Sequence, residues 1–318
     1  MANFNERSAD AIAQKTKEIL KDPALIEKAV KKEAASIISG RIAKRFFDDA
    51  YAISYSKADL ARRPFLNIGP GSFRHSNWRT ADKKYGDGSA AWTEMRRGVK
   101  QAPVDYYWDV YTGDQMSEED SFFKVIYTSH VIEHLFPQDV TFLLSEAQRL
   151  LEPGGVLRIV CPDAEQIANA YRERDWVFFM NYLIAKTGRQ STPMSKMREP
   201  LLAELAAEFL IEWTSLLTHK GNPITLNRAQ CVKFLAGYSD IFEAFDEASR
   251  LSSRELNQSA GGHVNWFSRE KLKRLLHEAG FSRINESAYL KSSIPVLRDS
   301  RYFDRTDPEM SLFMEAIK

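Results

Sequence analysis

Three short groups of residues have the types and the spacing that a ligand site needs. The first is the run from Leu66 to Gly71, in which apolar residues lead into Gly69-Pro70-Gly71, with Asp82 further on. Glycines directly after a strand let the backbone approach a ligand closely, and an acid at the end of the next strand can accept both ribose hydroxyls. Phe73 stands near the place of the third glycine of the dinucleotide fingerprint. Taken alone, this group is better explained as an ordinary tight turn.

The second group is Tyr107-Trp108-Asp109-Val110. An acid beside aromatic side chains can accept a hydrogen bond from an adenine amino group while a ring covers the base. A surface-loop aspartate explains this group equally well.

The third group, His130-Val131-Ile132-Glu133-His134, directly follows the apolar run 122–129, which is suited to a buried strand. Ligands of open parallel sheets bind beyond the carboxyl ends of the strands, so we expect His130 to face that crevice. For His134 we expect a partly buried ring whose nitrogen is satisfied by backbone carbonyls.

Strands and helices alternate around these groups. A helical stripe runs from Val140 to Leu151, Pro153-Gly154-Gly155 ends it, and Val156 to Val160 form the next strand. Ser268 is the expected N-cap of a helix that ends at Gly280, and residues 311–317 are the expected closing strand. Strand–helix–strand units predict a parallel sheet covered on both faces. We therefore predict an α/β, doubly wound fold.

Two segments break this alternation. Residues 1–60 have helical spacing, with Asp22-Pro23 as an N-cap and first helical position, and we expect an N-terminal helical arm. Residues 166–261 are expected to be a helical insertion that lies over the strand ends. The core domain then comprises residues 61–165 and 262–318. The arm is suited to packing on the core, to covering the site or to forming a homodimer.

Composition limits the partners. The 318 residues carry a formal net charge of +1, which gives no reason to expect nucleic acid or an anionic membrane. Cys161 and Cys231 are far apart and match neither a zinc nor a disulfide pattern, so a reducing compartment suits them. The first residues lack an apolar signal core, and apolar runs stop short of the ~18 residues of a membrane span. We expect a soluble, cytoplasmic protein.

Together, the three groups resemble the class I S-adenosylmethionine-dependent methyltransferases, in particular the type 11-like group with a shortened first helix. That shortening accounts for the close spacing of Gly69 and Asp82. The resemblance covers residues 64–165 well and 263–318 loosely. It implies a Rossmann-like methyltransferase sheet and S-adenosylmethionine as cofactor. The stretches of sequence on which the resemblance rests are Leu66 to Gly71, Ser76 to Asp82, His130 to His134, and Leu150 to Arg158 followed by Cys161-Pro162-Asp163.

The resemblance also implies roles for single residues. Asp82 would contact the ribose, Asp109 the adenine, and His130 would lie near the transferring methyl group. The methionine end of the cofactor would lie against Asn67, Gly69, Gly71 and Ser72. At two positions the chain departs from the pattern, because Asn67 replaces a common acid and Lys124 replaces the aspartate that commonly opens the fourth strand.

Methyl transfer from a sulfonium is an in-line displacement, so the protein mainly has to hold the acceptor, the methyl carbon and the sulfur collinear. A general base is needed only for an unactivated hydroxyl or a protonated amine. The candidates are His130, Asp163 and His263. By analogy with related proteins we expect O-methylation of a small molecule, such as a sugar or lipid-linked sugar. The expected acceptor contacts come from the insertion, with Trp176, Tyr182, Trp213 and His219.

Two alternatives remain open. His130-x-x-Glu133-His134 matches the inverted zincin pattern, in which two histidines four apart on a helix bind zinc and the glutamate is the base. Downstream acids at positions 204, 208 and 212 offer a third ligand, but Pro137 leaves little helix around the motif, and we assign no metal ligand. The other alternative is a chain that binds the cofactor and only scaffolds a partner.

Overall fold

The computed structural model describes residues 31, 45–84, 103–186, 192–260 and 262–318. The chain divides into two compact units, residues 1–57 and 58–318. In the first unit, residues 45–54 are helical, as expected for the arm. The expected cap at Asp22-Pro23 lies outside the described residues. The second unit begins around the short helix α3 (Lys57–Arg62) and contains every feature discussed below.

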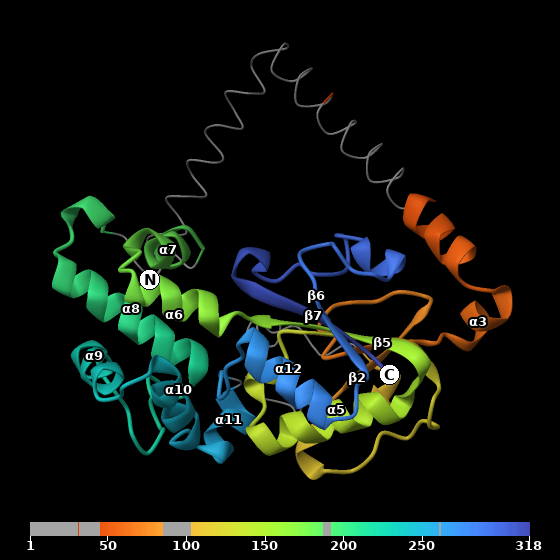
Figure 1. Ribbon diagram of the computed structural model, residues 1–318, viewed down its shortest axis with the longest axis horizontal. Helices are drawn as coiled ribbons and strands as arrows, with labels where there is room; N and C mark the ends of the chain where they lie inside the picture. Colours follow the sequence, from red (N-terminus) through yellow and green to blue (C-terminus); the bar gives the residue numbers. More distant parts are fainter. Residues whose placement is uncertain (1–30, 32–44, 85–102, 187–191, 261) are drawn as a thin grey trace. The chain divides into compact units, whose positions relative to one another are not determined.

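The centre of the second unit is a sheet with the strand order β3-β2-β1-β4-β5-β7-β6 (Figure 1). Its first five strands are mutually parallel, whereas β7 runs antiparallel to both of its neighbours. This sheet, with helices packed on it, confirms the predicted doubly wound α/β fold. The strands are β1 (Phe65–Ile68), β2 (Trp78–Asp82), β3 (Tyr106–Tyr107), β4 (Phe123–Ser129), β5 (Leu151–Pro162), β6 (Arg283–Glu286) and β7 (Ser311–Ile317).

Both faces of the sheet are buried, as a parallel sheet requires. On one face, Leu66 and Ile68 of β1 join a core with the helices α5 (Pro137–Leu150) and α12 (Arg269–Glu278), which contact each other. On the other face, Tyr127 packs edge-on against Phe303, and Trp78 lies 5.0 Å from the same ring between centroids. The alternation of strand side chains therefore builds a layer on each side of the sheet.

Local signals position most of these elements. The Ser268 hydroxyl accepts a hydrogen bond from the backbone of Lys271 and so caps α12, and Gly280 follows the helix with φ +92°. The predicted closing strand is β7. The predicted turn at Pro153-Gly154-Gly155 is wrong in one respect, because β5 begins at Leu151, directly after α5. The glycines instead lie at an irregularity in the pairing of β5 with β4, where Gly154 takes φ +80°.

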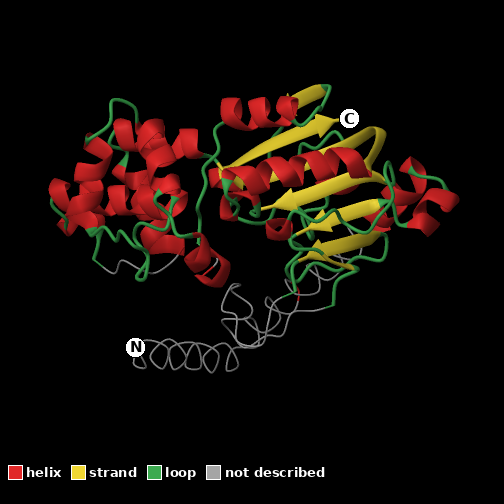
Figure 2. Ribbon diagram, turned by 90° about the horizontal axis from the view of Figure 1, so that it is seen from below, coloured by secondary structure: helices red, strands yellow, loops and turns green. Residues whose placement is uncertain are grey.

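The segment between β5 and α12 is helical. Its helices are α6 (Ala164–Arg172), α7 (Trp176–Met180), a π-helical turn (Asn181–Lys186), α8 (Glu199–Thr214), α9 (Arg228–Ala236), α10 (Ile241–Arg250) and α11 (Arg254–Ala260). They enclose an apolar core of their own, which contains Phe179, Phe209 and Phe245. Figure 2 shows this helical segment beside the ends toward which the parallel strands run. Short 3-10 turns lie at Val110–Thr112, Ile132–His134, Met194–Lys196, Pro295–Arg298 and Pro308–Met310.

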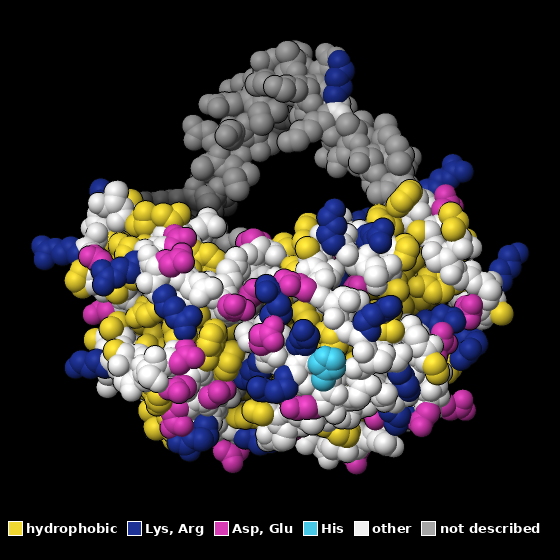
Figure 3. Space-filling view, viewed as in Figure 1, with side chains coloured by type: hydrophobic (Ala, Val, Ile, Leu, Met, Phe, Trp, Pro, Cys, Tyr) yellow, Lys and Arg dark blue, Asp and Glu magenta, His cyan; other side chains and the backbone are white. Residues whose placement is uncertain are grey.

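Two surface properties bear on partners. On the face shown in Figure 3, the described acidic and basic side chains are interspersed. None of the described helices is both long and apolar enough to cross a lipid bilayer.

Candidate active site

A cavity of about 820 Å³ opens at the carboxyl ends of β1 and β4. This volume is in the range of small-molecule sites. Ile68 of β1 pairs with Thr128 of β4, so the two strands end side by side. The segments that follow them therefore form neighbouring walls of the cavity. The predicted residues that line the cavity are Asn67, Gly69, Gly71, Ser72, His130 and His263. The structure thus brings together six of the nine predicted site residues.

The glycine turn after β1 forms one wall. Gly69 and Gly71 have φ values of +68° and +51°, in the left-handed region that side chains rarely adopt. A Cβ on Gly69 would lie 2.3 Å from Cγ2 of Val131, so there is no room for a side chain. Residues 69–77 form turns without a helix, which agrees with a shortened first helix. The backbone itself is therefore exposed to a ligand here.

Asp82 and Asp109 are not among the residues that line this cavity, although both follow strands at the same edge of the sheet. The Oδ1 atom of Asp82 accepts a hydrogen bond from the backbone of Lys83 at 2.9 Å. Oδ1 of Asp109 accepts one from the backbone of Tyr111 at 3.0 Å and caps the turn at Val110–Thr112. Their predicted contacts to ribose and adenine stay predictions.

His130 stands where β4 leaves the sheet, with the left-handed φ of +53°. Its Nδ1 lies 3.0 Å from Oε1 of Glu133, and its Nε2 lies 3.0 Å from the Ser311 hydroxyl. The Ser311 hydroxyl in turn donates to the Asp307 carbonyl. Burial alone would lower the pKa of His130, but the Glu133 carboxylate, together with Asp307 and the Thr306 backbone, outweighs burial and raises it. Both ring nitrogens are therefore engaged, and the imidazolium form is favoured.

Glu133 is 1% exposed, and within the described residues neither of its carboxylate oxygens accepts a hydrogen bond. Glu133 forms an ion pair with His130, with 3.0 Å between Oε1 and Nδ1. Burial would raise the pKa of Glu133, yet the surrounding histidines His130, His134 and His263 hold it well below its usual value. The site therefore contains a buried carboxylate that stays ionised, with the His130 ring beside Oε1 and no hydrogen-bond partner for Oε2 among the described residues.

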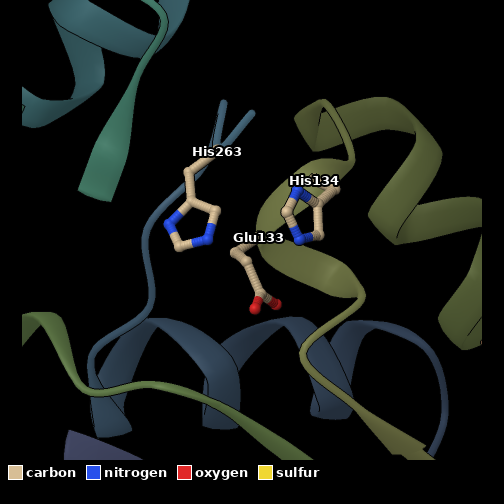
Figure 4. A group of neighbouring side chains, drawn as sticks. All are labelled: Glu133, His134 and His263. Atoms are coloured by element: carbon tan, nitrogen blue, oxygen red, sulfur yellow. The ribbon is translucent and has the colours of Figure 1, made fainter. Parts of the chain in front are cut away.

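His134 and His263 lie on either side of the Glu133 side chain (Figure 4). Nδ1 of His134 is 3.1 Å from the Gly262 carbonyl, and Nδ1 of His263 is 3.0 Å from the Trp213 carbonyl. Because a carbonyl only accepts, we assign the proton to Nδ1 in both rings, which makes Nε2 the nitrogen with a lone pair. The expectation of a carbonyl-bound, partly buried His134 agrees with this geometry. Burial lowers the pKa of His263 to about 4, so its ring is neutral.

Asp163, the third candidate base, does not line the cavity. Its Oδ1 accepts hydrogen bonds from the backbone of Glu165 and Gln166 and caps α6. Pro162-Asp163-Ala164-Glu165 is a helix-start pattern, and this signal was available in the sequence. The structure thus gives Asp163 a capping role, and its predicted catalytic role stays a prediction.

The zinc arrangement expected from the inverted zincin pattern is not formed. Ile132–His134 make a single 3-10 turn, and His130 precedes it at the end of β4, so the two histidines do not share a helix face. His134 instead lies near His263, with 4.9 Å between ring centroids. Of the downstream acids, Glu208 pairs with Arg228 at 2.7 Å, whereas Glu212 reaches the cavity.

The helical segment contributes lining residues, as expected for Tyr182, Trp213 and His219. Trp176 packs instead against the apolar core of that segment. Sequence reasoning missed the lining residues Arg301 and Arg305, which lie in the irregular stretch before β7, and no motif marks them. Arg301 is held by Asp299, with 2.5 Å between Nη2 and Oδ2.

The chain is thus an α/β protein with a cavity at the carboxyl edge of its sheet. Residues 41–286 match the family model described as a methyltransferase domain, and the chain therefore belongs to this methyltransferase family. This membership confirms the predicted class of S-adenosylmethionine-dependent methyltransferases.

The solved structures to which this chain is similar are distant in sequence. A SAM-dependent methyltransferase from Archaeoglobus fulgidus has 13% identity and a TM-score of 0.33, over 80% of this chain and 85% of that one. One from Mesorhizobium loti has 12% identity and a TM-score of 0.33, over 80% and 90%. The CurJ carbon methyltransferase has 13% identity and a TM-score of 0.33, over 80% of this chain and 47% of that chain, so this chain spans about half of its length. No curated protein matches the sequence.

Proposed function

We propose that this chain transfers a methyl group from S-adenosylmethionine to a hydroxyl oxygen of a small, sugar-type acceptor. The observation that carries the proposal is the single cavity that joins the glycine turn after β1 to the histidines after β4. Gly69 and Gly71 line this cavity without side chains, which fits the close approach of a bound cofactor to the backbone. S-Adenosylmethionine supplies a methyl group on a positively charged sulfur.

In the proposed arrangement, the backbone of Gly69 and Gly71 and the side chain of Asn67 border the methionine end. Asp82 accepts the ribose hydroxyls, and Asp109 contacts the adenine. His130, at the end of β4, lies beside the transferring methyl group. Its contacts with Glu133 and Ser311 fix the ring, so we assign it a positioning role.

The acceptor lies on the side of the helical segment, where both aromatic and polar side chains line the cavity. Tyr182 and Trp213 offer the rings, and His219 and Arg305 offer polar contacts. This mixture suits a compact polyhydroxylated molecule. The acceptor oxygen attacks the methyl carbon in line with the sulfur, the C–S bond breaks, and its electron pair stays on sulfur.

An unactivated hydroxyl has to lose its proton during this step. Among the three predicted bases, His263 has the suitable geometry, because its Nδ1–H is bound to the Trp213 carbonyl and its Nε2 is an acceptor. His263 also lines the cavity, whereas Asp163 does not. In protein without bound metal, the proton is therefore assigned to the cluster of Glu133, His134 and His263.

Calorimetric titration of metal-free protein with S-adenosylmethionine and S-adenosylhomocysteine tests the cofactor site. We expect one-to-one binding of both, and Asp82→Ala should weaken it by about 1–3 kcal/mol because a charged hydrogen-bond acceptor is lost. Asp120→Ala is the matched control, since that carboxylate is 75% exposed and should leave binding unchanged. Folded protein that binds neither compound would contradict the proposed function.

A further inference from the structure

We propose that Glu133, His134 and His263 bind a divalent transition-metal ion, to which the acceptor hydroxyl coordinates. This inference rests on the proposed function for its role in methyl transfer, but the ion site itself stands on geometry alone. The ligand atoms of the three side chains all lie within 4.8 Å of one another. Two imidazoles and one carboxylate are a common ligand set for zinc and for iron(II).

The protein holds the three ligands in place from two segments far apart in the sequence. The backbone of Val264 and that of Asn265 both donate to the Glu133 carbonyl, at 2.8 Å and 3.1 Å. The Gly262 carbonyl in turn accepts from the His134 ring. These bonds tie the turn after β4 to the chain around His263, so the ligand set is assembled by the fold.

The two histidines also have the surroundings of metal ligands. A metal-binding imidazole usually donates its second ring N–H to a carboxylate or backbone carbonyl, which fixes the tautomer and orients the ring. Both rings do this here through Nδ1, to the carbonyls of Gly262 and Trp213. Figure 4 shows the two rings flanking Glu133, so a shared ion would lie between them.

Glu133 provides the second, independent observation. A buried carboxylate normally accepts several hydrogen bonds, because removing an ionised group from water is costly. Within the described residues, neither oxygen of Glu133 has a hydrogen-bond partner, although the side chain is 1% exposed. Because Oε1 already lies 3.0 Å from Nδ1 of His130, a metal ion here would supply a partner for the other carboxylate oxygen.

The cluster is open to the cavity, since all three side chains line it. Three protein ligands leave a position for an exchangeable molecule, as in catalytic rather than structural zinc sites. A hydroxyl bound there would lose its proton more readily, for the same reason that zinc-bound water does, and the proton would pass to solvent water in the cavity. The coordinated oxygen would then face the same space as the glycine turn.

Zinc binding to chelator-treated full-length protein tests the site directly. We expect one equivalent of zinc by titration and metal analysis, and cobalt(II) in its place should give the visible absorption of a low-coordinate site. Glu133→Gln, His134→Ala and His263→Ala should each weaken zinc binding by more than about 100-fold, beyond the 10–100-fold typical of residues around the ligands. His277→Ala, on the exposed side of α12, is the matched control and should retain the ion. Circular dichroism should be used to check that each variant is folded.

The outcomes separate this proposal from the proposed function. Absence of zinc binding, or binding that survives all three substitutions, would overturn the ion site even if S-adenosylmethionine still binds. Zinc binding without any binding of S-adenosylmethionine would instead leave the ion site standing and contradict the methyltransferase role. Loss of zinc in the three variants, with S-adenosylmethionine affinity kept, is the result that we expect.

Discussion

Glu315 and Glu133 are both about 2% exposed or less, yet their surroundings are opposite. Glu315 on β7 accepts hydrogen bonds from Arg158 at 3.0 Å, from the backbone of Ser293 at 2.9 Å and from the Ser292 hydroxyl. Arg158 also binds Asp304 at 2.6 Å, and Asp304 is contacted by Tyr127. Glu133, at the cavity, has three histidines around it and no hydrogen bond within the described residues.

The difference separates a charge that holds the fold from a charge that is available to a ligand. Buried polar groups that stabilise the fold have hydrogen-bond partners, because a buried polar group without a partner destabilises the folded state. The network around Arg158 joins the sheet to the stretch before β7. The carboxylate of Glu133 keeps its coordinating capacity. Each region therefore predicts a different response to the loss of one charge.

The largest expected effect is on the satisfied network. Arg158→Met leaves Asp304 and Glu315 buried without their cation and should lower the free energy of unfolding by about 3–5 kcal/mol. Urea denaturation followed by circular dichroism measures this. Arg172→Met is the control, because its pair with Asp240 is roughly half exposed on both sides and should change stability by less than about 1 kcal/mol. Equal losses of stability in the two variants would show that the buried network around Arg158 does not stabilise the fold more than an exposed ion pair does.

The next effect concerns the backbone at the cavity. Gly69→Ala should weaken S-adenosylmethionine binding by roughly 10–100-fold, because the methyl group needs the space of Val131 and displaces the turn. Gly113→Ala is a matched control, since Gly113 has a similar φ of +73° but nothing within 4 Å of an added Cβ. Its strain should cost about 1 kcal/mol of stability and leave cofactor affinity intact. Calorimetric titration of both variants with S-adenosylmethionine shows whether the steric clash with Val131 or the positive φ angle is responsible for the loss of affinity.

Sequence reasoning reached the elements whose signals are local. Ser268 and Gly280 mark the two ends of α12 by capping chemistry that needs no tertiary contact. The extent of β7 follows from an apolar run. The glycines of Pro153-Gly154-Gly155 were misread as a free turn because pairing with β4, which the local sequence does not contain, draws them into β5.

The site was predictable in part for the same reason. The glycine turn and His130 follow strands, and the rule for parallel sheets places both at one edge. The meeting of Glu133 with His263 depends on backbone bonds between segments that are far apart in sequence, so spacing alone could not reveal it. Spacing suggested His130 and His134 as a pair, but one left-handed residue at His130 ends the regular geometry that this pairing needs.

The smallest expected effect is the pH dependence of stability in metal-free protein. The pKa of His130 is raised in the folded state by Glu133, so its contact stabilises the fold fully below the unfolded pKa of 6.5, and this contribution is lost as pH rises through the raised folded pKa. We expect a decline on the order of 1 kcal/mol, the scale of one charged contact. Glu133→Gln should flatten this decline in urea denaturation at a series of pH values, whereas Glu118→Gln, in the Arg79 pair, should keep it. If stability still declines with rising pH in Glu133→Gln, the buried carboxylate at the cavity is not paired with His130. The positioning role assigned to His130 would then be wrong.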